Sequence, residues 1–227
     1  MAKRGITFRE NDDIQKPIYD TVAKGWTMSS LVLSAPAQKT NYVDRPGGDG
    51  AWDLSTTMTD GITRYQNRTL TVALECSEGD RLTRETLIRE MVTLLDGKRL
   101  RVILPDDTTR HLLGRIHVAR KYSDLAHASV TVTVDCEPWK YSNVLTNHLW
   151  GLTTTESTKT ITILDGRSVV PTIEVGGEAR LVFGTSSISL SKGKHRWPDL
   201  LLTPGTHQLK VSGSSSLILS YREGVLE

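Results

Sequence analysis

A glycine- and aspartate-rich stretch at residues 43–55 has the residue types of a ligand-binding loop. It reads VDRPGGDGAWDLS, which could form a phosphate-binding loop, a calcium loop or a tight turn. The phosphate-binding loop is not expected, because no Gly-Lys-Ser/Thr follows and no strand-to-helix transition is predicted there. The aspartates lack the alternate-position spacing of a calcium loop, and no glutamate closes it. The stretch is therefore predicted to be a turn.

The other residues that could do chemistry are scattered along the chain. The six histidines have no cysteine or acidic partner at metal-ligand spacing, so no metal site is predicted. The sequence has no Gly-x-Ser-x-Gly motif and no Cys-His arrangement of a nucleophile. A pair of carboxylates that cleaves a glycoside needs only proximity in space, so the sequence leaves that pair open. We expect no enzyme activity and no cofactor.

Composition and charge are those of an ordinary globular protein. The 227 residues carry a formal net charge of +2, which gives no field that would favour nucleic acid or an anionic membrane. No run of 18 apolar residues occurs, and no signal-peptide segment follows the start MAKRGITFREND. We expect a soluble protein made in a cytoplasm. Cys76 and Cys136 end alternating strands and are predicted to be buried free thiols rather than a bridge.

The elements of the first half read as an α+β domain. Apolar residues alternate in TLTVALEC (69–76) and SVTVTVDC (129–136), which predicts two half-buried strands of an antiparallel sheet. Between them, residues 82–97 have apolar residues at helical spacing, with Thr83 as the expected cap and Gly97 just past the end. A hairpin with a turn at residues 105–107 follows. The helix is expected to pack on the sheet.

The second half has a different character. After a Thr/Ser-rich stretch, short alternating runs are separated by turn residues every 8 to 12 positions, with no helical run, which is typical of a β-sandwich. The expected fold class is mainly β. The expected domains are an α+β domain over 1–142, a linker over 143–158 and a sandwich over 159–227.

The order of these segments resembles the distal tail protein family of long-tailed phages with non-contractile tails. The resemblance is carried by YVDRPGGDGAWDLS, the strand TLTVALEC, the helix end LLDGKRLRVILPDD, the strand VTVTVDCEPWKYS and the C-terminal LTPGTHQLKVSGSSSLILSYREGVL. It covers nearly the whole chain. Trp139 departs from the family pattern, which prefers Tyr there, and GGDG stands in place of GRDG.

The resemblance implies a structural virion protein of the phage tail tip. Six copies would form a hub ring that joins the tail tube protein to the receptor-binding or tail-fibre proteins, with a galectin-like C-terminal sandwich. The glycine stretch would then be a tight belt loop with Asp49-Gly50 as its turn and a contact to a neighbouring subunit or partner, made by Arg45, Gly47, Gly48, Asp49, Gly50 and Trp52. Trp52 could be core or contact, and core is favoured.

An alternative function is a carbohydrate-binding module that acts in attachment to the host surface. It depends on the C-terminal sandwich alone, and an exposed aromatic platform would distinguish it. Trp197, at a turn before Pro198, is the candidate platform.

Overall fold

A computed structural model describes residues 4–10, 17–59, 61–123, 126–164 and 166–226. Strands make up 55% of the chain and helices 9%, so the predicted mainly-β class is confirmed. The chain divides into two compact units, residues 1–140 with 226–227 (unit 1) and residues 141–225 (unit 2). Within the described residues, no helix is long and apolar enough to span a membrane.

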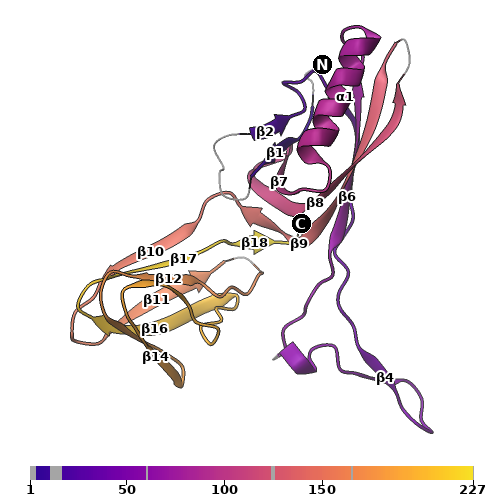
Figure 1. Ribbon diagram of the computed structural model, residues 1–227. Coiled ribbons are helices and arrows are strands. Elements are labelled where there is room, and N and C mark those ends of the chain that lie inside the picture. The colour runs from indigo at the N-terminus through magenta and orange to yellow at the C-terminus, as the bar shows by residue number, and fades with distance from the viewer. Residues whose placement is uncertain (1–3, 11–16, 60, 124–125, 165, 227) are drawn as a thin grey trace. The chain divides into compact units, whose positions relative to one another are not determined.

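Unit 1 is built on one antiparallel sheet with the strand order β2-β1-β7-β8-β9-β6-β3 (Figure 1). A short strand, β18 (Gly224–Val225), also pairs with β9, the strand in which the division of the chain falls. The sheet strands of unit 1 are β1 (Thr7–Arg9), β2 (Pro17–Asp20), β3 (Thr27–Leu33), β6 (Arg68–Cys76), β7 (Arg99–Leu104), β8 (Asp107–Ser123) and β9 (Ala128–Ser142).

The two alternating strands predicted from the sequence are confirmed as β6 and β9. They pair antiparallel with Leu70 opposite Val134 and Leu74 opposite Val130, so their apolar residues share one buried face. β6 and β9 lie beside each other within the sheet. The edges are β2 and β3. Sequence alternation gives the face of a strand but not its neighbours.

Helix α1 (Arg81–Leu95) covers the apolar face of this sheet, as expected. Ile88, Met91 and Leu95 are buried in the same core as the β6 and β9 residues. Thr83 is not the N-cap, so that prediction is wrong. The N-cap is Asp80, whose carboxylate accepts a hydrogen bond from the Thr83 N–H at 2.7 Å. A carboxylate at that position satisfies an N–H that has no partner in the helix. Gly97 follows the helix with a positive φ of 73°, as predicted.

Unit 2 is a β-sandwich of two four-stranded antiparallel sheets, β10-β17-β12-β15 and β11-β16-β13-β14. Its core contains Ile161, Ile173, Leu181, Leu209 and Leu219, from both sheets. The strands are β10 (Thr146–Gly151), β11 (Ser157–Ile163), β12 (Thr172–Val175), β13 (Ala179–Phe183), β14 (Ser186–Leu190), β15 (Gly193–Arg196), β16 (Gly205–Gly213) and β17 (Ser216–Tyr221).

The linker expected over residues 143–158 is wrong for most of its length. Strand β10 lies inside it and pairs with β17 over six residues, from Thr146 opposite Tyr221 to Gly151 opposite Ser216. The Thr/Ser-rich composition had suggested a linker, but threonine also suits a strand, and the neighbouring strand β17 supplies hydrogen-bond partners for the backbone of β10. A sandwich that began at residue 159 would lack this strand.

Both cysteines are buried free thiols, as predicted. Burial raises the pKa of the Cys136 thiol from its ordinary 9.0 to about 12, and burial raises the pKa of the Tyr19 hydroxyl from 10.0 to about 12. Both groups are therefore neutral in the folded chain at a pH where the unfolded chain has already lost these protons.

We expect the free energy of unfolding to fall as the pH rises above about 9. Between the unfolded and folded pKa values, each group costs about 1.4 kcal/mol of stability per pH unit, because only the unfolded state loses the proton. Urea unfolding from about pH 8 to about pH 10.5 measures the slope. The Cys136→Ala variant should lose stability less steeply with pH than the unchanged chain, and equal slopes would contradict this assignment.

Candidate functional site

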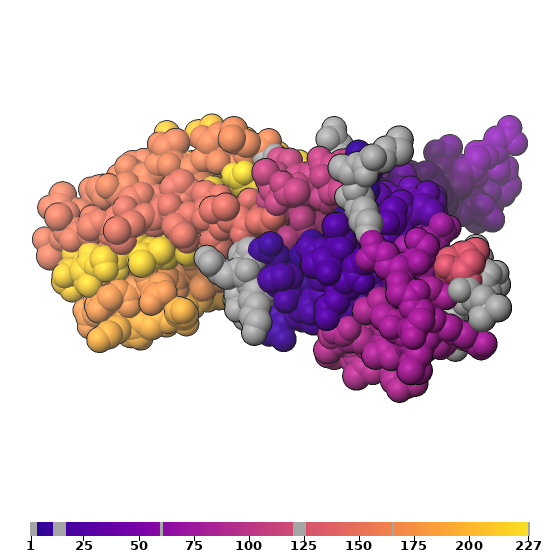
Figure 2. All heavy atoms as spheres, turned by 90° about the horizontal axis from the view of Figure 1, so that it is seen from above, coloured from indigo at the N-terminus to yellow at the C-terminus, as the bar shows by residue number. Residues whose placement is uncertain are grey.

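The residues predicted to contact a neighbour lie at the tip of a long excursion between β3 and β6. This excursion, residues 34–67, is called the arm below. It carries the hairpin of β4 (Tyr42–Asp44) and β5 (Ala51–Asp53) and a single 3-10 turn, η1 (Thr57–Thr59). The ribbon leaves the sheet of unit 1 and projects away from it (Figure 1), and in Figure 2 the violet atoms of the arm stand apart from the rest of unit 1.

The tip is a tight turn, as predicted, although its central residues differ. The Gly48 N–H donates to the Arg45 carbonyl at 3.3 Å, which places Pro46 and Gly47 at the centre of the turn. Proline fixes the first central φ, and Gly47 supplies the positive φ of 72° that a type II turn needs next. Asp49-Gly50 follows this turn instead of forming it. Gly50 also has a positive φ, 75°, and accepts a hydrogen bond from the Arg45 N–H.

Trp52 is a surface residue, so the preference for a core position is wrong. Its side chain is 49% exposed and pairs across the hairpin with Val43. The Arg45 guanidinium lies 5.8 Å from the centre of the Trp52 ring. The hairpin has only two strands and no second layer, so nothing in the arm can bury the indole.

Further apolar side chains are exposed on the arm, and the sequence prediction missed them. Met58 is 93% exposed, and the other large apolar residues exposed on the arm are Tyr42, Val43 and Leu54. No described residue of the arm belongs to the buried core of unit 1. Apolar groups clustered on a soluble surface typically mark a contact with another molecule. One feature of the sequence could have indicated these exposed residues. An apolar pair stands on each side of the glycine turn, and no further strand is available to cover the two pairs.

The base of the arm is attached to the sheet. Gln38 and Tyr65 form an isolated antiparallel bridge, and the Lys39 N–H donates to the Arg64 carbonyl at 2.8 Å. The Tyr65 ring packs edge-to-face on Trp139 of β9, with 5.7 Å between ring centres. The base is thus fixed while the tip extends, which suits an element that reaches another molecule.

Trp197 is not a sugar platform. Its side chain is 5% exposed and belongs to the core of unit 2. Because Trp197 precedes Pro198, it was predicted to lie at an exposed turn. Its ring instead packs in the core of the sandwich. Phe183 is partly buried and packs against that core.

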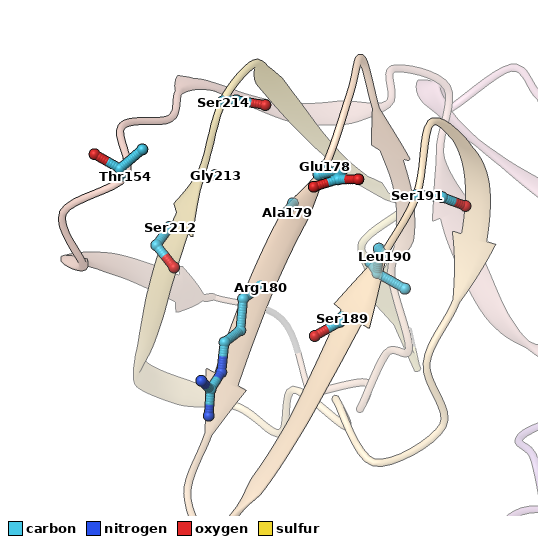
Figure 3. Close-up of a pocket in the computed structure, with 10 residues that line it drawn as sticks. All are labelled: Thr154, Glu178, Ala179, Arg180, Ser189, Leu190, Ser191, Ser212, Gly213 and Ser214. Atoms are coloured by element: carbon cyan, nitrogen blue, oxygen red, sulfur yellow. The ribbon is translucent and has the colours of Figure 1, made fainter.

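A hollow of about 520 Å³ lies over the β16-β13-β14 face of the sandwich (Figure 3). Arg180 of β13 lies in register with Ser189 of β14 and Ser212 of β16, so these three side chains form a row across the face. Glu178 immediately precedes β13. The ten lining residues include four serines and no aromatic residue. Nor do three metal-binding side chains gather anywhere in the described part of the chain.

The whole structure is similar to solved phage proteins. The SPP1 Dit protein, described as a paradigm of the hub adsorption apparatus in Gram-positive infecting phages, superposes with a TM-score of 0.65 over 96% of this chain and 98% of its own, at 14% identity. The chain has the fold of a phage distal tail protein. The phage P2 baseplate, in its activated conformation with calcium, gives a TM-score of 0.44 at 9% identity over 97% and 98% of the two chains. No family model and no curated protein matches the sequence.

The distal tail fold accounts for the order of elements along the chain. At 14% identity the agreement lies in the arrangement of elements and not in particular side chains. The resemblance read from short motifs therefore holds at the level of the fold, since both units of the chain are included in the superposition.

We expect the full chain to bind no simple galactoside. Fold does not carry sugar chemistry, because specific exposed side chains do, and Trp197 is buried. Titration with lactose while tryptophan fluorescence and NMR line positions are followed is the measurement. The full chain is used because a fragment that begins at residue 158 would lack β10. A saturable shift would contradict the expectation.

Proposed function

We propose that this protein is a structural subunit of a phage tail tip. Six copies form a ring at the end of a long non-contractile tail, with the tail tube protein on one face and the receptor-binding or tail-fibre proteins on the other. The observation that carries the proposal is the likeness to the SPP1 Dit protein over almost the full length of both chains. The protein acts in the virion tail after synthesis in the bacterial cytoplasm, and its role is structural rather than catalytic.

One of the two edges of the sheet in unit 1 supports assembly. β2 is short and begins with Pro17, both of which discourage pairing with another strand. β3 spans seven residues, TMSSLVL, with no charged residue and no proline, and among the named strands it pairs with β6 alone. Near its start the Met28 N–H donates to the Arg4 carbonyl at 2.8 Å, so the open part of this edge is the later part of the strand. Such an edge is open to backbone pairing with a second chain. In a head-to-tail contact this edge would meet a different surface of the next subunit, and such contacts close into a ring where the rotation allows it.

The arm supplies the second contact in this proposal. Its exposed apolar residues have no cover within the described part of the chain, and its tip carries Arg45 and three aspartates that can select an orientation. The carbohydrate-binding alternative has less support, because Trp197 is buried and no aromatic residue lines the hollow on the sandwich.

Light scattering and electron microscopy of the purified chain test the ring. At tens of micromolar, alone or with the tail tube protein, we expect a mass near six times 25.2 kDa and closed rings in the images. If the chain stays at the mass of one subunit under both conditions and forms no rings, the proposed ring is contradicted and only the fold is retained. A closed ring with a different number of subunits would retain the hub and change its symmetry.

A further inference from the structure

Basic side chains from strand β15, from the residue after β17 and from the segment between β11 and β12 meet at one cavity of unit 2. The cavity has a volume of about 380 Å³ and lies on the β10-β17-β12-β15 sheet, the opposite sheet from the hollow of Figure 3. Its charged lining residues are Arg167, Glu174, Lys194, Arg196 and Arg222. Four positive charges and one negative charge therefore share one concave site.

The strand register explains why these residues meet. Arg196 of β15 is opposite Thr172 of β12, which is opposite Ser220 of β17, so the three side chains form a row on one face. Arg222 follows Ser220 by two residues, which returns it to the same side of the chain. Arg167 comes from the segment between β11 and β12. Every lining residue belongs to unit 2.

Only one of the four cations has a carboxylate beside it in the described part of unit 2. The Lys194 ammonium lies 3.6 Å from the Glu174 carboxylate. The Arg222 guanidinium donates through Nη1 to the carbonyls of Ser142 and Asn143, at 2.8 and 2.9 Å. Both acceptors are neutral, so they orient this guanidinium without cancelling its charge.

Neither of the other two guanidinium groups has a carboxylate beside it among the described residues of unit 2. Arg167 donates to the Arg222 carbonyl at 3.3 Å, and its guanidinium lies 4.8 Å from the centre of the Tyr141 ring, which holds it in place. Arg196 is exposed and has no hydrogen bond or ion pair within the described residues. Desolvation lowers the pKa of the Arg222 guanidinium, so burial of its charge is unfavourable without an anion.

We propose that this cavity binds a phosphate group, held by the guanidinium groups of Arg167, Arg196 and Arg222. Guanidinium groups donate in pairs to phosphate oxygens, and a phosphate monoester carries about −1.5 to −2 charge with three acceptor oxygens. A single carboxylate would neutralise less of the site. The hydroxyls of Thr172 and Ser220 add further donors in the same row. The cavity is larger than one phosphate, so the group can belong to a larger polar molecule.

Calorimetric titration of the full chain tests the site with four probes: inorganic phosphate, glycerol 3-phosphate, the diester glycerophosphoglycerol and hexaglutamate. We expect saturable binding of at least one phosphate probe at one site per chain, weaker at higher salt. Tightest binding of inorganic phosphate would indicate a free anion as the natural ligand, and tightest binding of the diester a phosphodiester chain. No saturable binding of any phosphate probe, or tighter binding of hexaglutamate than of all three, would overturn the proposal. The latter would indicate an acidic protein segment instead.

Two variants separate the site from general charge effects. Arg196→Gln removes an exposed guanidinium without internal bonds, so the fold should persist while affinity for the phosphate probe falls about tenfold. Arg180→Gln is the matched control, because it removes the same charge from an exposed position on the other sheet of the sandwich. Equal losses in the two variants would overturn the proposal. The site goes beyond the tail-tip function and does not depend on it, since a monomeric chain can bind phosphate and a ring can form without it.

Discussion

Replacement of arm residues 41–62 by a two-residue Asn-Gly turn is expected to give a folded chain that no longer forms a ring. The Lys39 N–H and the Arg64 carbonyl already face each other at the base of the arm, so a tight hairpin turn can join the strands there. The change removes β4, β5 and the exposed residues Trp52 and Met58. No residue of the core is removed, so the melting temperature should stay within a few degrees.

The mass in solution, measured by light scattering with and without the tail tube protein, decides this prediction. We expect the shortened chain to remain at the mass of one subunit where the full chain assembles. Trp52→Ala should weaken assembly in the same direction, because it removes an exposed indole from the arm. Leu82→Ala is the matched control, since Leu82 is an exposed apolar residue of unit 1 on helix α1. Rings formed by the shortened chain would show that the arm is not the contact.

Substitution of Gly114 by alanine is expected to destabilise unit 1 by about 3 kcal/mol. Gly114 lies in β8, and a Cβ atom there would meet the Asp135 carbonyl oxygen at 2.5 Å and a methyl of Val134 at 2.7 Å. Both residues belong to β9, whose distance from β8 is fixed by the hydrogen bonds of the sheet. Backbone cannot move aside as a surface side chain can, so the strands must separate.

Urea unfolding followed by circular dichroism measures the loss. Gly48→Ala is the control, because the nearest atom to its new Cβ would be the Arg45 Cβ at 3.7 Å, an ordinary contact. We expect that variant to change the free energy of unfolding by less than about 0.5 kcal/mol. If Gly114→Ala and the unchanged chain unfold at a similar urea midpoint, β8 and β9 can move apart at little cost and the prediction is contradicted.

The glycine stretch shows how far local sequence rules extend toward a site. They predicted a turn in the right stretch, because glycines with a positive φ are a property of single positions, but they centred it on Asp49-Gly50 instead of Pro46-Gly47. They placed Trp52 in the core, because a large aromatic side chain is usually buried when a second layer is available. The arm has no such layer. Whether a layer exists depends on where the chain goes after the turn, and residues 43–55 do not contain that information.

The basic cavity could not be predicted for a related reason. Arg167, Arg196 and Arg222 are far apart in the sequence, and each by itself looks like an ordinary surface arginine. Pairing of β12 with both β15 and β17 brings them together. Burial of Trp197 is similar, because the core that takes up its ring comes from both sheets of the sandwich.

The sequence by itself determined the elements whose signal is local. Alternation of apolar residues set the faces of β6 and β9, helical spacing set the buried stripe of α1, and the change to short strands divided the chain in two. These patterns are strong because each buried face must be apolar whatever lies against it. Only the tertiary structure decided which strands are neighbours, that the edges are β2 and β3, and that the arm leaves its tip uncovered. Those features depend on contacts between residues that are far apart in the sequence. The free energy of such a contact depends on both partners, so no single segment determines it.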